Sequence, residues 1–103
     1  MSTRTDIIKL YKSMLENRSY SLVLLFHERL EDYGVRINYQ SVYHGLMQDG
    51  RFEDLLLNYD LLQAKGVSVD YELVLDDMRR NCDPESIDRF SDVFAAHHVA
   101  VSV

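Results

Sequence analysis

Few residues that break helices or cross-link chains occur in this sequence. Its 103 residues include one proline, four glycines, one cysteine and no tryptophan. The scarcity of proline and glycine argues against a loop-rich or all-β chain and favours helices. The lone thiol, Cys82, excludes an intramolecular disulfide and has no zinc-ligand spacing around it, so we expect a reducing compartment. No apolar run approaches the about 18 residues of a membrane-spanning helix, so we expect no membrane span.

Acidic residues outnumber basic ones, and the excess lies in the last third of the chain. The formal net charge is −6. Residues 1–33 carry five acids and five bases, whereas residues 67–103 carry eight acids and three bases, a net charge of −5. Such a surface repels a nucleic-acid backbone and attracts a basic protein surface. We therefore expect protein partners with a basic surface, in a multi-subunit assembly.

One pattern occurs twice in the sequence, first from position 34 and again from position 66. Residues 34–42 and residues 66–74 both read G-V-x-[I/V]-[N/D]-Y-x-x-V, and we call the offset between them the repeat period. Each glycine suits the left-handed backbone position that ends a helix, so we predict a positive φ at Gly34 and Gly66. Asn38 and Asp70 then stand where the next helix needs an N-cap. A recurring unit of this kind predicts a helical-hairpin repeat.

The repeat period, carried through the chain, predicts an all-α fold. We expect one domain over residues 1–103, an α-solenoid of three stacked antiparallel hairpins, with repeats at about residues 3–34, 35–66 and 67–98. The six expected helices span residues 6–15, 19–33, 38–48, 52–65, 70–80 and 84 to 97 or 98. One hairpin cannot bury its apolar face alone, and about three stacked hairpins are needed for stability.

The middle of the chain resembles a pentatricopeptide repeat. Residues 39–67 carry its tyrosine, its G-L pair, its turn glycine followed by a basic residue, its acidic pair and its closing K-G-V. Residues 17–35 resemble the second half of such a repeat, and residues 70–80 resemble the first half. The repeat period, from position 34 to position 66, is shorter than the about 34 residues of the sister tetratricopeptide repeat. That sister family shares the hairpin architecture and stays open as an assignment.

The resemblance implies a non-catalytic protein-interaction module, a small subunit or adaptor of a larger complex. It also implies a mitochondrial location, because such proteins are mostly organellar; the location would otherwise be cytoplasmic. Family members that read RNA use paired positions, which fall here on Lys9 with Arg36 and on Ser41 with Ser68. Leu73 stands at the third such site without a partner. An organellar RNA-binding factor is therefore the alternative function.

A second resemblance lies near the N-terminal end. The residues Leu10-Tyr11-Lys12 are similar to the L-Y-R signature of small mitochondrial three-helix adaptors. Those proteins are typically basic and lack a glycine-bounded repeat, so this assignment ranks below the other two.

No motif for catalysis, for a metal or for a cofactor is visible in the sequence. His97 and His98 are adjacent and point about 100° apart on a helix, so they are poorly placed to share one metal ion. We expect no enzyme, no metal and no cofactor. The candidate partner-binding residues are Lys9, Tyr20, Arg36, Ser41, His44, Asp70, Asp76 and Asp77.

Overall fold

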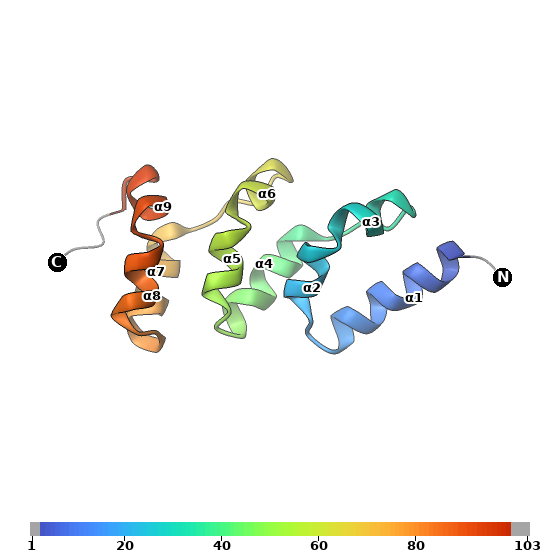
Figure 1. Cartoon of the computed structure of the whole chain (residues 1–103), viewed down its shortest axis with the longest axis horizontal. Coiled ribbons are helices and arrows are strands. Elements are labelled where there is room, and N and C mark those ends of the chain that lie inside the picture. Colours follow the sequence, from blue (N-terminus) through green and yellow to red (C-terminus); the bar gives the residue numbers. More distant parts are fainter. Residues whose placement is uncertain (1–2, 100–103) are drawn as a thin grey trace.

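The protein is all-helical throughout the described part of the chain. The computed structural model describes residues 3–99, with side chains from Thr5 onward, and no strand occurs in that range. Nine helical segments follow one another between Thr3 and Ala96 (Figure 1). They are α1 (Thr3–Glu16), α2 (Tyr20–Leu25), α3 (His27–Asp32), α4 (Tyr39–Gln48), α5 (Phe52–Leu57), α6 (Tyr59–Ala64), α7 (Tyr71–Asn81), α8 (Pro84–Arg89) and α9 (Ser91–Ala96).

The helices are laid out along one long axis. The molecule measures 57 × 24 × 17 Å, with α1 at one end and α7, α8 and α9 at the other (Figure 1). Helix α1 packs on α2 and α3, α4 packs on α5, α7 packs on α8, and α2 packs on α4. We call residues 3–34 unit 1, residues 35–66 unit 2 and residues 67–98 unit 3. The radius of gyration is 15.1 Å, above the about 13 Å of a globular chain of this length.

The second helix of each unit is divided in two, which was not predicted. The divisions fall at Phe26, Asn58 and Phe90, which are separated by one repeat period each; φ there lies between −113° and −104° and ψ between 14° and 19°. This is the sparsely populated region between helix and strand. The i→i−4 hydrogen bonds resume at once, for example from the Leu30 N–H to the Phe26 carbonyl at 3.0 Å. The expected six helices therefore become nine segments, because each second helix is interrupted at a residue that is neither proline nor glycine.

Helix ends follow a regular pattern that confirms the glycine prediction. Positive φ angles occur at Arg18 (56°), Gly34 (85°), Gly50 (71°), Gly66 (85°) and His98 (61°), which are evenly spaced along the chain except for a gap at position 82. At each of them the residue's own N–H bonds the carbonyl three positions back, and the next N–H bonds the carbonyl five positions back. This is the Schellman motif that ends a helix. The five helix ends are therefore the same structure.

At each joint, a predicted N-cap residue and a tyrosine of the preceding unit connect one unit to the next. The side chain of Asn38 accepts the Ser41 N–H at 3.1 Å, and the side chain of Asp70 accepts the Leu73 N–H at 3.1 Å. The backbone N–H groups of the same two residues donate to tyrosines of the preceding unit. Asn38 donates to Tyr11 Oη at 3.3 Å, and Asp70 donates to Tyr43 Oη at 3.1 Å.

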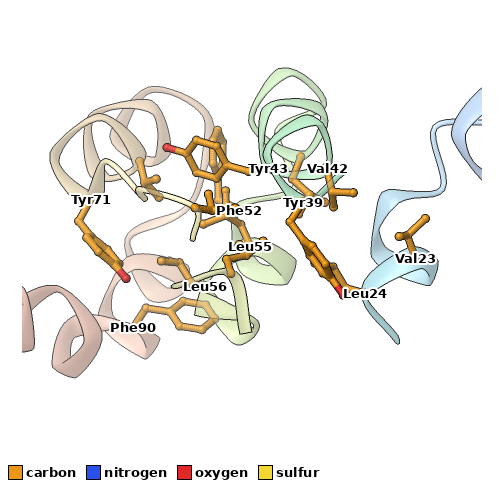
Figure 2. Close-up of a cluster of buried hydrophobic side chains, with 14 of the residues drawn as sticks. Val23, Leu24, Tyr39, Val42, Tyr43, Phe52, Leu55, Leu56, Tyr71 and Phe90 are labelled. Carbon is orange, nitrogen blue, oxygen red and sulfur yellow. The ribbon is translucent and has the colours of Figure 1, made fainter. Parts of the chain in front are cut away.

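The core runs through all three units as one apolar cluster. Leu55 and Leu56 of α5 lie in the middle of the part shown in Figure 2, and their exposed fractions are 0% and 1%. No polar or charged side chain is buried within residues 5–99. Hydrophobic contact therefore supplies most of the stabilisation that holds one unit on another.

The core predicts a sharp contrast between two adjacent leucines of α5. Leu56 is buried, whereas Leu57 is 70% exposed. We expect Leu56→Ala to lower the free energy of unfolding by about 2–5 kcal/mol, because it leaves a cavity in the central unit. Leu57→Ala is the matched control and should change it by less than about 0.5 kcal/mol. Chemical denaturation measures both values, and equal losses for the two variants would contradict this burial.

Candidate docking face at the N-terminal end

Each unit packs on the preceding one through equivalent positions, and unit 1 leaves these positions uncovered. Val42 of unit 2 and Val74 of unit 3 are 0% exposed, whereas the equivalent Leu10 of unit 1 is 48% exposed. Phe90 is 6% exposed, whereas the equivalent Phe26 is 41% exposed. Units 2 and 3 have a neighbour on this side, and unit 1 has none among the described residues. The positions that make a joint elsewhere thus form an open face.

The open face contains an apolar groove between α1 and the pair α2–α3. Its volume is about 420 Å³. The lining residues are six apolar side chains and one cation: Ile7, Leu10, Met14, Leu22, Phe26, Leu30 and Arg29. We call these seven residues the N-terminal face. An exposed apolar surface of this kind typically marks an interaction site.

Unit 1 lacks the polar groups that the later units use at the same joint positions. Asp54 of unit 2 accepts a hydrogen bond from Ser21 of unit 1 at 2.6 Å, but the equivalent residue of unit 1 is Leu22. Lys65 of unit 2 donates to a carboxylate of unit 1, but its equivalent is Tyr33. The N-terminal face is therefore more apolar than the joints inside the chain.

A three-residue network closes the joint between units 1 and 2. Tyr39 Oη donates to Glu31 Oε1 at 2.7 Å, and Lys65 Nζ donates to Glu31 Oε2 at 2.9 Å. The Lys65 ammonium also lies 5.4 Å from the centre of the Tyr39 ring. The Tyr39 and Lys65 hydrogen bonds lower the pKa of Glu31, while burial and the Glu31 bond raise the pKa of Tyr39. The network holds Glu31 charged at neutral pH.

The joint between units 2 and 3 repeats this arrangement with different chemistry. Gln63, Tyr71 and His97 stand at the equivalent positions, each one repeat period further along the chain. Gln63 Nε2 lies 3.3 Å from His97 Nε2, and the His97 ring stacks on Tyr71 at 3.8 Å and 14°. The Tyr71 hydroxyl is buried without a hydrogen-bond partner, and burial raises its pKa to about 12. At these positions the second joint has a histidine–tyrosine stack in place of the Glu31–Lys65 ion pair, and its own ion pair lies elsewhere, between Arg89 Nη1 and Glu53 Oε1 at 3.3 Å.

The three predicted acidic site residues have local partners. Asp70 is the N-cap of α7. Asp77 lies 2.6 Å from Arg80, and Asp76 lies 4.0 Å from Arg79, both as i,i+3 pairs on α7. Their first role is to stabilise α7, and the expected basic partner of this region stays a prediction.

Tyr20 belongs to the joint between units 1 and 2 and is half-buried. A Cβ at Gly45 would lie 2.3 Å from its ring, so the ring sits directly on the glycine backbone. Arg18 stacks over the same ring at 5.5 Å and donates two hydrogen bonds to Asp49, at 2.9 and 3.1 Å. The predicted partner-binding role of Tyr20 thus competes with a packing role.

The remaining predicted residues are exposed. Lys9 and Ser41 stand at equivalent positions of α1 and α4, and Arg36 lies between α3 and α4. His44 is exposed on α4, 3.1 Å from Gln40. No hydrogen bond or ion pair within the described part of the chain joins Lys9 to Arg36 or Ser41 to Ser68, so the expected base-reading pairs are not connected directly.

A stack of three hairpins without capping helices was expected to leave its end faces open for docking, but none of the residues of the N-terminal face was among the predicted partner-binding residues, because all apolar helix positions were treated alike. Leu10 and Phe26 are in phase with the buried face of their helices. The alignment of the units contained the missing signal, since no other unit in the described part of the chain covers these positions in unit 1.

No metal-binding group of three His, Cys, Asp or Glu side chains occurs among the described residues. Cys82 is half-buried, and burial raises the pKa of its thiol. None of the described helices is both long and apolar enough to span a membrane.

No protein family model, no curated protein and no solved structure matches this chain significantly. The likeness to pentatricopeptide repeats therefore rests on the residues given above.

The Glu31 network predicts a pH-dependent contribution to stability. Because the folded state lowers the pKa of Glu31 below its ordinary 4.5, this contribution is complete above that value and is lost as the pH falls through the lowered pKa. We expect Glu31→Gln to destabilise the protein at neutral pH and to differ less from the wild type as the pH falls through the lowered pKa. Denaturation at neutral pH and at a series of lower pH values checks this. Glu28→Gln, an exposed change on the same helix, is the control, and an equal pH trend in both variants would contradict the assignment.

Proposed function

We propose that this protein is a non-catalytic interaction module, a short pentatricopeptide-like α-solenoid that serves as a subunit or adaptor of a larger complex. The observation that carries the proposal is the N-terminal face. The position of Leu10 is buried in both later units and that of Phe26 is buried in unit 3, yet Leu10, Leu22 and Phe26 remain 41–48% exposed. A face built from packing positions fits a protein surface better than a small polar ligand, because Arg29 is its only polar anchor among the lining residues.

The size of the face limits the binding free energy that a partner can gain from it. Complete burial of a leucine or phenylalanine side chain contributes about 1.5–3 kcal/mol. Three side chains that are already about half covered contribute on the order of 3 kcal/mol in total. A micromolar complex needs about 8 kcal/mol. The partner therefore also contacts the rim of the face or another part of the module.

The acidic unit 3 offers such a second contact. It carries the net charge of −5 and lies at the opposite end of the 57 Å long axis. Screening limits its field to about 8–10 Å in physiological salt, so it attracts a basic surface at that end only. A mitochondrial location belongs to the same proposal and rests on the resemblance.

Two leucines of similar exposure provide a matched test. Leu10 on the N-terminal face is 48% exposed, and Leu73 on α7 is 44% exposed. We expect Leu10→Glu to reduce native co-purification of the complex at least about tenfold, because a charge then faces an apolar contact. Leu73→Glu should retain the complex, and both variants should keep the wild-type unfolding free energy, since both side chains are exposed.

The same co-purification experiment distinguishes protein binding from RNA binding. If the complex survives Leu10→Glu, and if RNA co-purifies and is lost on joint substitution of Lys9→Ala and Arg36→Ala, then the chain is an RNA-binding factor and the present proposal is wrong.

A further inference from the structure

We propose that the N-terminal face receives the last helical hairpin of another protein, so that two chains build one continuous helical stack that ends at unit 3 of this chain. The inference rests on the proposed function and names the partner's chemistry. The partner presents an aliphatic helix-hairpin surface with a carboxylate opposite Arg29.

The partner's shape follows from the joints inside the chain. The joint between units 1 and 2 is formed by the second-helix region of unit 1 against the first helix of unit 2, since α2 packs on α4. Tyr39 and Val42 of unit 2 lie beside Val23 and Leu24 of unit 1 in this joint (Figure 2). The N-terminal face has the first-helix side of this contact, but no preceding second helix packs on it among the described residues. A helical hairpin is therefore the surface that fits it.

The partner's charge follows from Arg29. The equivalent residues are Leu61 and Val93, which are partly buried against the core. Arg29 lines the groove, and its side chain makes no ion pair or hydrogen bond within the described part of the chain. Docking removes water from this guanidinium, and an unpaired buried charge is strongly unfavourable. The occupant therefore supplies a carboxylate.

The opposite end of the chain is built differently. Unit 1 and unit 2 insert Leu24 and Leu56 into the following joint, with exposed fractions of 2% and 1%. The equivalent residue of unit 3 is Asp88, which is exposed. Pro84 replaces the aromatic ring of Tyr20 and Phe52, and Ala95 replaces Glu31 and Gln63. A polar end of this kind is what a terminal unit of a helical stack requires.

These two ends disfavour a second copy as the occupant. Head-to-tail stacking would bury Asp88 of one copy against the apolar groove of the next. Pairing of two N-terminal faces would leave both Arg29 groups unpaired, because no carboxylate is among the lining residues. The occupant is consequently a different chain.

A probe for the face can be made from the chain itself. Joining residues 1–38 directly to residues 7–103 adds one hairpin in register, since Tyr39 and Ile7 are equivalent. The added unit 1 then covers the N-terminal face. Glu31 of the added unit pairs with Lys65 at the native joint. In the extended chain it lies next to Tyr33 and Arg29 of the original unit 1. Joining residues 1–99 to residues 68–103 adds a hairpin of the same length at the other end and buries Asp88 instead.

We expect the first extension to raise the thermal unfolding midpoint by at least about 4–8 °C and the second to leave it unchanged or lower it. In the first extension, Glu31→Gln in the added hairpin should remove part of the gain, and Glu28→Gln should not. Equal gains at both ends, or no gain at the N-terminal end, would overturn the inference. Sedimentation of the unextended chain should show a monomer, and a dimer abolished by Leu10→Glu would overturn it as well.

The native complex distinguishes failure of this inference from failure of the proposed function. A photo-reactive phenylalanine analogue at Phe26 should cross-link to a helical segment of a different chain. Arg29→Glu should weaken the complex at least about tenfold, whereas Arg29→Lys should retain it. Cross-links to a non-helical segment leave the interaction module in place and overturn the hairpin partner. Absence of any cross-link, together with a complex that tolerates Leu10→Glu, overturns both.

Discussion

The structure depends on one constraint: an α-hairpin has an apolar face that it cannot bury by itself. Each unit covers part of the face of its neighbour, so every unit needs another one beside it. The central unit satisfies this constraint on both sides, as the complete burial of Leu56 and Leu62 shows. The end units satisfy it in opposite ways. Unit 3 replaces a joint leucine with Asp88, whereas unit 1 keeps an apolar face and adds Leu22 to it. The contrast between the ends is the main functional information in the molecule.

The two internal joints show how far the chemistry can change while the geometry is kept. Glu31, Tyr39 and Lys65 form a charged network, and Gln63, Tyr71 and His97 form a stacked one at the same positions. In both, the side chain at the end of the second helix lies over the ring of the first-helix tyrosine. The ring and the Schellman helix end are thus the fixed parts of a joint, and the residues that contact the ring are the variable parts.

The sequence predicted the helical class, the turn glycines and both N-caps, because these depend on local chemistry that repeats visibly. Arg18 and His98 adopt the same left-handed conformation as the glycines, but arginine and histidine do not predict this conformation as glycine does. The breaks at Phe26, Asn58 and Phe90 were missed for a similar reason, since the three residues share no helix-breaking property. The residues of the candidate site were missed because exposure depends on which units are adjacent, and helix periodicity alone does not contain that information. Asp70, Asp76 and Asp77 were chosen for their charge, and the structure gives each of them a partner on its own helix.

The breaks in the second helices have a mechanical consequence. Each of the six resulting segments contains only six residues, which is too short for a helix to be stable without its neighbours. The first helices contain 10 to 14 residues and form the stiffer layer. The molecule therefore has one layer of long first helices and a second layer of short helical segments. Positions 26, 58 and 90 are therefore the points where this layer of short segments is interrupted.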